Sequence, residues 1–342
     1  MHSLPELGWT PFFEALFMEH AAEGLMAGRV TFASRERYRA LTWSGDLDAE
    51  PAGRLRHLAG AREELPAVGD WVALSPPQGG PAIVQAVLPR RSVLARKDAG
   101  RGSQREVVAA NVDTVFLVTS LDRDLNPRRL ERGLALVWDG GASPVILLTK
   151  ADLVSPEEAE AGLALVERLS PAVPVHAVSA LGGDGLDQLA DYLRPGRTVA
   201  LLGSSGVGKS TLLNRLAGHE LEATGGVRAS DGRGRHTTTH RHLVRLPAGG
   251  LLVDTPGVRE LGLTGEEDLG KVFADVADLA KTCRFRDCRH EREPGCVVRA
   301  AIPPDRLESW RKLQREERYA AQRREHTAAY VEKRRWKRFT SR

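Results

Sequence analysis

The sequence lacks long apolar segments. No run of apolar residues reaches the roughly 18 residues that a membrane-spanning helix needs, and the N-terminus lacks the basic region and apolar region of a secretory signal. The 342 residues are 42% hydrophobic, which is typical of an ordinary soluble protein and sufficient for the cores of two or three domains. The sequence therefore predicts a cytoplasmic protein without a membrane partner.

The sequence also has little cysteine, and its three cysteines occur in one short segment. Cys283, Cys288 and Cys296 combine with His290 in the pattern C-x4-C-x-H-x5-C. An odd number of cysteines in one cluster argues against a disulfide framework. Three thiolates and an imidazole complete a closed tetrahedral shell, which predicts one structural Zn²⁺. The alternative is a set of buried free thiols beside an unrelated histidine.

A glycine-rich run from Gly203 to Ser210 has the pattern GxxxxGK[ST]. Residues 197–202 have the pattern of a buried strand and residues 210–216 that of a helix, so the run predicts a phosphate cradle at a helix N-terminus. Lys209 is expected to reach the β and γ phosphates of a nucleotide, and Ser210 to bind Mg²⁺. A glycine-rich turn without a ligand is the alternative. The predicted phosphate-binding residues are Gly203, Ser204, Ser205, Gly206, Val207, Gly208, Lys209, Ser210 and Thr211.

A second phosphate-related motif lies downstream. Asp254 ends the hydrophobic run 250–254, and it is predicted to anchor Mg²⁺ through water. Gly257 follows, and its backbone N–H is expected to meet the γ-phosphate. The polar stretch 232–239 between the two motifs has no apolar periodicity and predicts a switch loop, in which Thr238 is expected to contact Mg²⁺ when GTP is bound.

Two short motifs predict recognition of guanine rather than adenine. A carboxylate at Asp152 accepts hydrogen bonds from the ring N1–H and the exocyclic amine of guanine, and adenine has no matching donors. Thr149 stands where the common motif has Asn, which puts one hydrogen bond in question. The predicted guanine-binding residues are Thr149, Lys150, Ala151 and Asp152, with Ser179 and Ala180 contributing a backbone contact that closes over the base. Neither short motif is specific by itself.

The five motifs occur in the order guanine, guanine, phosphate, switch I, switch II, which is a circular permutation of the usual order in a GTP-binding domain. On these motifs the chain resembles the circularly permuted ribosome-associated GTPases of bacteria, and most closely the ribosome small-subunit-dependent RsgA (YjeQ) family. The resemblance spans about residues 28–301, and further matching segments are 68–72, 88–92, 109–113 and 234–239.

The resemblance implies a GTPase that binds the small (30S) ribosomal subunit and its 16S rRNA. It also implies a role in late maturation of the subunit, with GTP hydrolysed to GDP and phosphate, turnover stimulated by the subunit, and release controlled by the nucleotide. Mg²⁺ would accompany GTP, and the cysteine cluster would be a zinc knuckle. We expect a monomer.

The chain divides into three bodies with an α/β fold overall. Residues 1–24 are an N-terminal extension whose role the sequence does not indicate. Residues 25–100 contain short strand-like runs broken by Gly, Pro and Asp, which predict a small β-barrel, and the resemblance makes it an RNA-binding OB-fold. Strands alternate with helices in residues 101–263, which predicts a doubly wound, circularly permuted P-loop GTPase domain. Residues 264–342 are predicted to form a helical, basic, zinc-binding domain.

Two basic segments are candidates for RNA contact. Residues 306–342 contain 13 Lys or Arg against 5 Glu, interleaved with Trp310, Tyr319, Tyr330 and Trp336, a composition suited to stacking and phosphate contact. The alternative is a solvated helix held by salt bridges. Binding to an anionic membrane surface is less favoured, because the segment has no apolar stripe. The second basic segment follows the predicted barrel, and its cations either contact RNA phosphates along the backbone or form a solvated linker. These cations are Arg90, Arg91, Arg96, Lys97, Arg101 and Arg105.

The sequence lacks one common catalytic residue. Many GTPases place a glutamine after the glycine of the second phosphate motif, but this chain has Val258 there, which cannot hydrogen-bond the attacking water. His236 in the predicted switch loop is the nearest candidate, because imidazole can orient or accept from water near neutral pH, and the resemblance implies this role. The alternative is that His236 only positions the loop or contacts RNA. Gly206 stands where cation-activated relatives have Asn, so potassium-assisted hydrolysis is not supported.

Two other classes of function compete with this interpretation. A GTP switch that binds a non-ribosomal protein would keep the five motifs, but it explains neither the barrel nor the basic aromatic tail. A P-loop enzyme that phosphorylates a metabolite with ATP would have no reason for Asp152.

Overall fold

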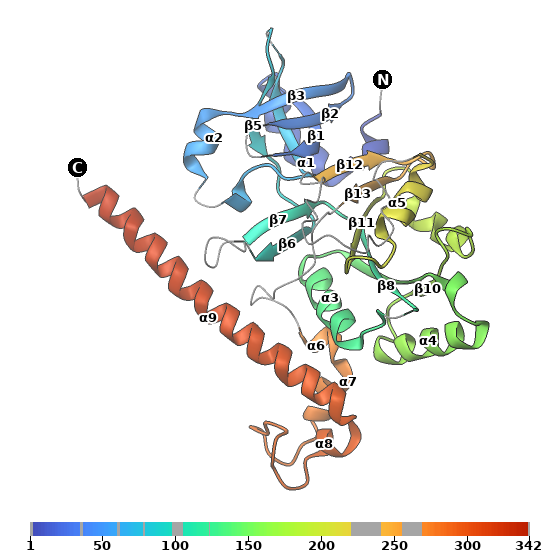
Figure 1. The fold of residues 1–342 in the computed structure, drawn as a ribbon. Coiled ribbons are helices and arrows are strands. Elements are labelled where there is room, and N and C mark those ends of the chain that lie inside the picture. Colours follow the sequence, from blue (N-terminus) through green and yellow to red (C-terminus); the bar gives the residue numbers. More distant parts are fainter. Residues whose placement is uncertain are drawn as a thin grey trace, which may run out of the picture.

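The structure is a computed structural model that describes residues 3–34, 37–59, 62–77, 79–97, 105–122, 124–219, 241–254 and 269–340. A barrel, a mostly parallel sheet with helices, and a helical C-terminal region follow one another along the chain (Figure 1). Among the described residues, no helix has both the length and the apolar character to span a membrane.

The N-terminal barrel is a closed sheet with the strand order β1-β2-β3-β5-β4, because β4 also pairs with β1. Its strands are β1 (Met26–Ala33), β2 (Tyr38–Thr42), β3 (Gly45–Pro51), β4 (Trp71–Ser75) and β5 (Ala82–Val87), with α2 (Gly53–Leu58) and η2 (Arg62–Glu64) between β3 and β4. Side chains that alternate along the strands fill the interior, including Val30, Ala40, Val72 and Leu74. The expectation of a five-stranded OB-fold barrel is confirmed.

The central sheet has the strand order β10-β9-β8-β11-β13-β12. All neighbouring strands are parallel except β12 and β13, which are antiparallel. The strands are β8 (Thr114–Ser120), β9 (Ser143–Thr149), β10 (Val175–Ala177), β11 (Thr198–Gly203), β12 (Arg241–Arg245) and β13 (Leu251–Asp254). Every residue of β8 is buried, as expected for a parallel strand covered on both faces.

Helices cover the central sheet. They are α3 (Pro127–Asp139), η3 (Ala151–Leu153), α4 (Pro156–Leu169), η4 (Leu186–Leu193) and α5 (Lys209–Ala217). A separate hairpin of β6 (Val93–Lys97) and β7 (Arg105–Ala110) connects the barrel to this sheet. The predicted doubly wound sheet is thus confirmed, and ligands of such sheets bind at the carboxyl ends of the strands.

The barrel and the central sheet are joined by strand pairing. The end of β1 pairs antiparallel with β12, with Phe32 opposite His242, and the two rings lie 5.1 Å apart. All strands of both bodies therefore belong to one continuous 11-stranded sheet. No local pattern in the sequence indicated this connection.

The N-terminal segment packs into the joint between these bodies. It consists of η1 (Pro5–Leu7) and α1 (Pro11–Ala22). The Trp9 ring stands edge-on to Trp71 of the barrel at 4.6 Å, and Phe13 lies 5.9 Å from Trp71. Leu7 and Phe13 are buried. The segment whose role the sequence did not indicate is thus part of the hydrophobic core.

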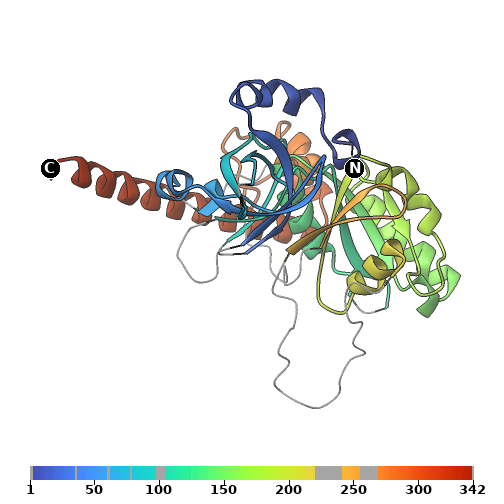
Figure 2. The same ribbon diagram turned by 90° about the horizontal axis from the view of Figure 1, so that it is seen from above.

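The C-terminal region is helical, as expected. It contains α6 (Leu269–Val272), α7 (Ala274–Ala280), α8 (Val297–Ala301) and α9 (Pro304–Thr340). The first turns of α9 dock on α3, where Arg306 donates to Glu131 at 2.8 Å and Ser309 also donates to Glu131. The rest of α9 projects away from the other elements as a single helix (Figures 1 and 2).

Candidate functional site

The glycine-rich loop joins β11 to α5, as its sequence pattern predicted. Gly206 and Gly208 have φ angles of 83° and 93°, in the left-handed region that favours glycine. A Cβ on Gly203 would lie 2.1 Å from the carbonyl oxygen of Val118 in β8, so only glycine permits this approach. The Lys209 ammonium donates to the carbonyl oxygens of Gly203 at 2.8 Å and Ser204 at 2.5 Å.

The loop presents its apex to solvent and its base to the core. Ser205 and Gly206 are exposed, whereas Val207 is buried. Ser210 and Thr211 follow Lys209 in the first turn of α5. Backbone N–H groups of a helix N-terminus point outward and attract anions. The loop therefore has the backbone shape of a phosphate cradle.

The first guanine motif contacts this loop directly. Thr149 ends β9 and is buried. Its hydroxyl lies 2.6 Å from the carbonyl oxygen of Val207 and 3.1 Å from that of Thr119. A threonine hydroxyl has a single proton, so the shorter contact is the stronger hydrogen bond. Thr149 thereby provides a link to the phosphate loop at the position where the sequence left a hydrogen bond in question.

The rest of this motif turns away from the core. Lys150 has a φ of 61°, and its ammonium pairs with Asp122 at 3.0 Å. Ala151 donates from its backbone to the Val178 carbonyl at 3.3 Å. Asp152 lies in η3 with its side chain exposed, available to a base that binds at this edge of the sheet.

The second guanine motif forms a compact turn after β10. Ser179 is fully buried, donates from its backbone to the Asp184 carbonyl at 2.9 Å, and accepts from the Gly182 N–H at 2.9 Å through its hydroxyl. Ala180 is half-buried. The hydrogen bond between Ala151 and Val178 brings this turn beside the first motif, so both predicted guanine motifs meet at the carboxyl edge of the sheet.

Sequence reasoning missed three polar residues at the same edge. Asp122 and Asp124 follow β8, and Arg129 lies in the first turns of α3. Asp122 pairs with Lys150, while Asp124 pairs with Arg129 at 2.6 Å. Arg129 also donates to the hydroxyl of Ser204 in the phosphate loop. Two acids directly after a buried strand are the signal that could have identified this segment.

Some predicted site residues fall outside the described part of the chain. These are His236, Thr238, Gly257 and the side chain of Asp254. The backbone of Asp254 ends β13, which is the neighbour of β11 in the sheet.

The predicted metal ligands converge. Ligand atoms of Cys283, Cys288, His290 and Cys296 all lie within 4.8 Å of one another. His290 Nδ1 is 3.3 Å from Cys296 Sγ and 3.6 Å from Cys283 Sγ, and these two sulfurs are 4.0 Å apart. Zinc bond lengths give edges of about 3.5 Å for N···S and about 3.8 Å for S···S in a tetrahedral site. This cluster can therefore hold one metal ion.

Backbone hydrogen bonds shape the loop that carries His290. The carboxylate of Glu293 accepts from the N–H groups of Arg289 and Glu291 at 2.9 Å and of Arg292 at 3.0 Å. These bonds lower the pKa of Glu293 to about 2. His290 itself has a φ of 57°, and its carbonyl accepts from Arg311 of α9. The cluster is thus tied to α9.

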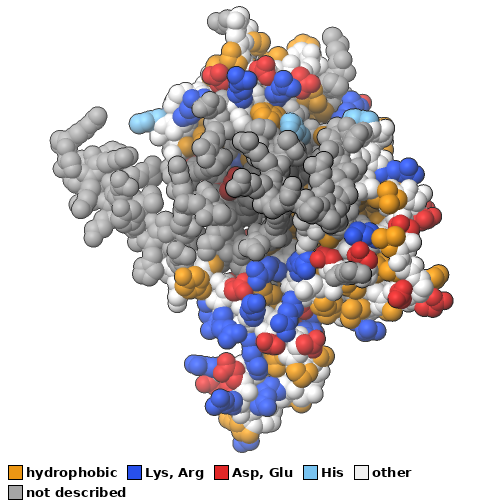
Figure 3. All heavy atoms as spheres, in the orientation of Figure 1, with side chains coloured by type: hydrophobic (Ala, Val, Ile, Leu, Met, Phe, Trp, Pro, Cys, Tyr) orange, Lys and Arg blue, Asp and Glu red, His pale blue; other side chains and the backbone are white. Residues whose placement is uncertain are grey.

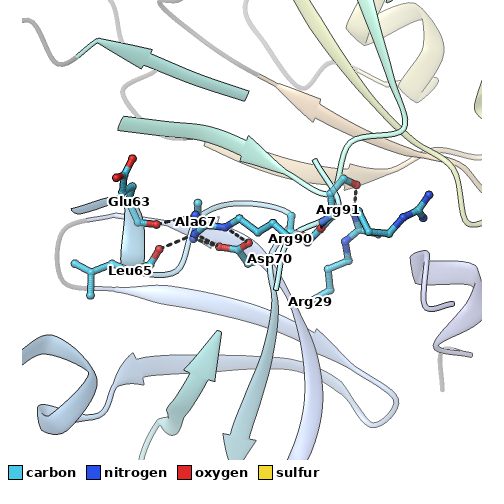
Figure 4. A network of polar contacts seen from close by, with 9 residues as sticks. Arg29, Glu63, Leu65, Ala67, Asp70, Arg90 and Arg91 are labelled. Carbon is cyan, nitrogen blue, oxygen red and sulfur yellow. Dashed lines mark hydrogen bonds and ion pairs between the residues drawn. The ribbon is translucent and has the colours of Figure 1, made fainter. Parts of the chain in front are cut away.

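Arg90 is not available for the phosphate tracking considered from the sequence. Figure 4 shows its side chain directed at Asp70, with Nε 2.7 Å from Oδ1 and Nη2 2.7 Å from Oδ2. Arg90 also donates to the Glu63 and Leu65 carbonyls at 2.7 and 3.0 Å. Burial raises the pKa of Asp70 although Arg90 opposes the shift. Arg91 remains about half exposed, 3.9 Å from Asp113.

Basic side chains gather over the C-terminal region. Figure 3 shows Lys and Arg concentrated over the lower part of the molecule, where α7, α8 and the start of α9 lie in Figure 1. The exposed basic residues around the metal cluster are Lys281, Arg284, Arg286, Arg289, Arg292 and Arg299. Phe285 is exposed among them. A surface of exposed cations with an aromatic ring suits contact with nucleic acid.

Comparison with known proteins identifies close relatives. The family model described as RsgA GTPase matches residues 87–264. The small ribosomal subunit biogenesis GTPase RsgA of Opitutus terrae is 47% identical, over 98% of this chain and 95% of that protein. The small ribosomal subunit biogenesis GTPase RsgA 2 of Lactiplantibacillus plantarum is 46% identical, over 86% of this chain and 84% of that protein.

Solved structures share the fold. The crystal structure of YjeQ from Thermotoga maritima matches with a TM-score of 0.63 and 27% identity, covering 86% of this chain and 98% of that chain. The structure of YloQ, described as a circularly permuted GTPase, matches in fold with a TM-score of 0.61 and 23% identity, covering 86% of this chain and 95% of that chain.

Proposed function

This chain belongs to the RsgA GTPase family and is a GTP hydrolase, and we propose that it acts in the biogenesis of the small ribosomal subunit. Relatives that match nearly the whole chain carry that function in their names. The observation that best supports a GTP site is the hydrogen bond from Thr149 to Val207. It joins the guanine motif to the phosphate loop although the loop comes later in the chain.

The proposed nucleotide site lies along the carboxyl edge of the central sheet. The phosphates would lie on residues 203–211, and the base between Asp152 and the turn of Ser179 and Ala180. Mg²⁺ fits because Ser210 lies in the first turn of α5 and Asp254 ends the strand beside the loop, with Thr238 as a further ligand. When bound, Mg²⁺ would neutralise charge on the β and γ phosphates.

The metal of the cysteine cluster is proposed to be Zn²⁺. Three sulfurs and one imidazole nitrogen are the donors that tetrahedral structural zinc sites use. The three distances among the ligand atoms of Cys283, His290 and Cys296 are close to the edges of such a site. All four positions are filled by the protein, so the metal would be structural.

His236 is proposed to assist catalysis. It belongs to the predicted switch loop, and Val258 cannot orient water in place of the usual glutamine. A histidine titrates near neutral pH and can accept or position a proton. The role of this residue rests on the sequence, because it lies outside the described residues.

The partner is proposed to be the small (30S) subunit, contacted through its 16S rRNA, in the cytoplasm and by a monomer. The OB-fold barrel and the exposed cations around the metal cluster support RNA contact. The proposed domains are 1–24, 25–100, 101–263 and 264–342. Nucleotide state would control release, because the chain passes from the second phosphate motif into the C-terminal domain.

The test is GTP hydrolysis by the purified protein alone and with stoichiometric 30S subunits. We expect the subunit to stimulate turnover and His236→Ala to remove the stimulation. His20→Ala, a partly exposed histidine on α1 and outside the proposed RNA-contacting parts, is the matched control and should keep it. Equal turnover with and without subunits would reject the proposed partner, and stimulation retained in His236→Ala would reject the catalytic role.

Co-sedimentation with 30S subunits over a salt titration separates this function from a GTP switch that binds another protein. Contacts between protein cations and RNA phosphates release counterions, so affinity should fall steeply as salt rises. Absence of co-sedimentation at low salt would favour the switch.

A further inference from the structure

Arg129 links α3 to the phosphate loop. Its Nη1 donates to Asp124 at 2.6 Å and to the hydroxyl of Ser204. The two hydrogens on that nitrogen are therefore both directed at acceptors. Ser204 is the second residue of the loop, and neither the sequence motif nor the family match assigns a function to Arg129.

Ser204 connects Arg129 with the loop lysine. Its hydroxyl accepts from Arg129, and its carbonyl oxygen accepts from the Lys209 ammonium at 2.5 Å. A displacement of Ser204 would therefore move an acceptor that holds Lys209. Because Lys209 is the residue expected to meet the β and γ phosphates, the position of Ser204 affects phosphate binding.

The base of Arg129 is rigidly supported. Asn126 caps α3 by accepting from the Arg129 N–H, and Leu130 beside it is buried. On its other side α3 docks on α9 through a buried ion pair between Glu131 and Arg306 at 2.8 Å. A side chain held by a capped and packed helix can position a loop accurately.

We propose that Arg129 is a positioning residue for GTP binding: it holds Ser204, and through Ser204 it holds Lys209 in place for the phosphates. A guanidinium suits this task because it is always charged and each of its terminal nitrogens carries two hydrogens, which here face the Asp124 carboxylate and the Ser204 hydroxyl. The inference rests on the proposed role of residues 203–211 in binding GTP.

A double-mutant cycle on the full-length protein tests the positioning role of Arg129. Affinities for GTP and GDP, and KM and kcat for GTP, are measured for the wild type, Arg129→Ala, Ser204→Ala and the double variant. Each single variant should weaken both affinities by about 5- to 10-fold, less than the loss of a hydrogen bond made directly between a charged group and the nucleotide, because Arg129 acts on the phosphates only through Ser204, and it should raise KM more than it lowers kcat. The double variant should be no weaker than the weaker single variant, because both remove the same interaction.

Arg128→Ala is the matched control. Arg128 is the neighbouring residue on α3, about half exposed, and its guanidinium pairs with Glu308 at 2.9 Å. Its loss removes the same charge from the same helix but no contact with Ser204, so nucleotide affinity should stay within about twofold of wild type. If Arg128→Ala weakened GTP binding as much as Arg129→Ala, the effect would come from charge alone and the proposal would be wrong.

Other outcomes are equally decisive. Unchanged affinity in Arg129→Ala, or additive losses in the double variant, would overturn the positioning role. Thermal unfolding confirms that the variants fold, and if Arg129→Ala does not fold, Ser204→Ala alone decides through its KM. A wild-type protein that does not bind GTP would instead refute the nucleotide site on which the inference rests.

Discussion

At the scale of single residues, Thr149 stands in the guanine motif where the common form of the motif has Asn, and it makes a hydrogen bond of its own to the phosphate loop. Thr149 has a shorter side chain than Asn, yet its hydroxyl lies 2.6 Å from the Val207 carbonyl. Thr149 and Val207 are 58 positions apart. The contact makes the phosphate loop and the guanine motif one unit.

Thr149→Val should remove the hydrogen bond that connects the guanine motif with the phosphate loop. Valine keeps the shape of threonine but leaves the Val207 carbonyl without its hydroxyl partner, which costs about 1–3 kcal/mol for a buried group. We expect a lower melting temperature and GTP affinity weakened by about 3- to 10-fold, measured by thermal unfolding and nucleotide titration. Thr31→Val on barrel strand β1, a partly exposed position, is the control and should change neither. Wild-type GTP affinity in Thr149→Val would contradict the link.

Asp152→Asn should change the base that is recognised. An asparagine amide can donate to the C2 carbonyl of xanthine but no longer accepts both donors of guanine. Hydrogen bonds to a charged group contribute about 1.5–3 kcal/mol, so GTP affinity should fall by about 10- to 100-fold while affinity for xanthosine triphosphate rises. Competition binding with both nucleotides measures this. Asp191→Asn, on the exposed face of η4, should keep the preference for GTP; an unchanged preference in Asp152→Asn would remove Asp152 from the base site.

At the scale of elements, α3 is a bridge with different contacts on its two sides. Arg129 reaches the phosphate loop, while Glu131 meets Arg306 and Ser309 of α9. Arg306 also pairs with Asp275 of α7 at 2.7 Å. Three helices from distant parts of the chain therefore share one polar cluster, and its charges make their docking sensitive to pH.

Glu131→Gln should change how the stability of the protein depends on pH. Burial raises the pKa of Glu131, and Ser309 and Arg306 only partly oppose the shift. Its folded state therefore holds a proton more tightly than the unfolded chain, so its stabilising contribution is complete below about pH 4.3 and is lost as pH rises through the folded pKa. The melting temperature of wild type relative to Glu131→Gln should therefore fall as the pH rises above about 4.3, measured by thermal unfolding over a pH series.

Asp275→Asn is the control, because its effect on stability should change with pH in the opposite direction. Burial would raise the pKa of Asp275, but Arg306 outweighs burial and lowers it. Its contribution is present above about pH 3.9 and is lost as pH falls through the folded pKa, so wild type should lose stability relative to Asp275→Asn on acidification. If the melting temperatures of both variants, relative to wild type, changed with pH in the same direction, the opposite pKa shifts of Glu131 and Asp275 would be contradicted.

The metal cluster should be required for the order of the segment between α7 and α9. Few apolar side chains are buried there apart from Cys296, Val298 and Ile302, so metal bonds must supply much of the stability. Removal of the metal with a chelator should increase amide exchange of residues 281–301 and lower the melting temperature. Cys283→Ser should reduce the bound metal from one ion to none, measured by elemental analysis. One retained ion would exclude Cys283 as a ligand.

At the scale of the whole molecule, a buried arginine marks the joint between the parts. Arg29 of β1 donates to the Leu7 carbonyl, to the Asn111 carbonyl at 2.9 Å and to the Thr198 hydroxyl at 2.9 Å. Desolvation lowers its pKa to about 10, so it remains charged at neutral pH. The barrel, the N-terminal segment and the strand that leads to the phosphate loop therefore meet at one side chain.

Phe13→Ala should loosen this joint. Phe13 is 1% exposed and packs against Trp71, so its truncation should cost about 3–5 kcal/mol of stability. Phe12→Ala is the matched control, because the neighbouring ring is 45% exposed and its loss should cost less than about 1 kcal/mol. Denaturant unfolding of both variants measures the difference. Equal stabilities would mean that the N-terminal segment does not belong to the folded core.

The sequence by itself determined the family, the fold class and the local shape of the sites. Glycine at positions 203, 206 and 208 specifies the phosphate loop because left-handed backbone and close strand packing exclude side chains there. The metal ligands fall within 14 residues, from 283 to 296, so their spacing alone predicted that they converge. The order of the motifs revealed the permutation, because order is a property of the sequence.

Only the tertiary structure decided which distant residues became partners. Arg129 and Ser204 are 75 positions apart, Arg29 and Thr198 are 169 apart, and Glu6 and Arg245, which pair at 2.8 Å, are 239 apart. It also turned Arg90 inward to Asp70 instead of outward to a phosphate. Local periodicity says which face of an element is buried, but the partner of a buried polar group depends on how separate elements pack against one another.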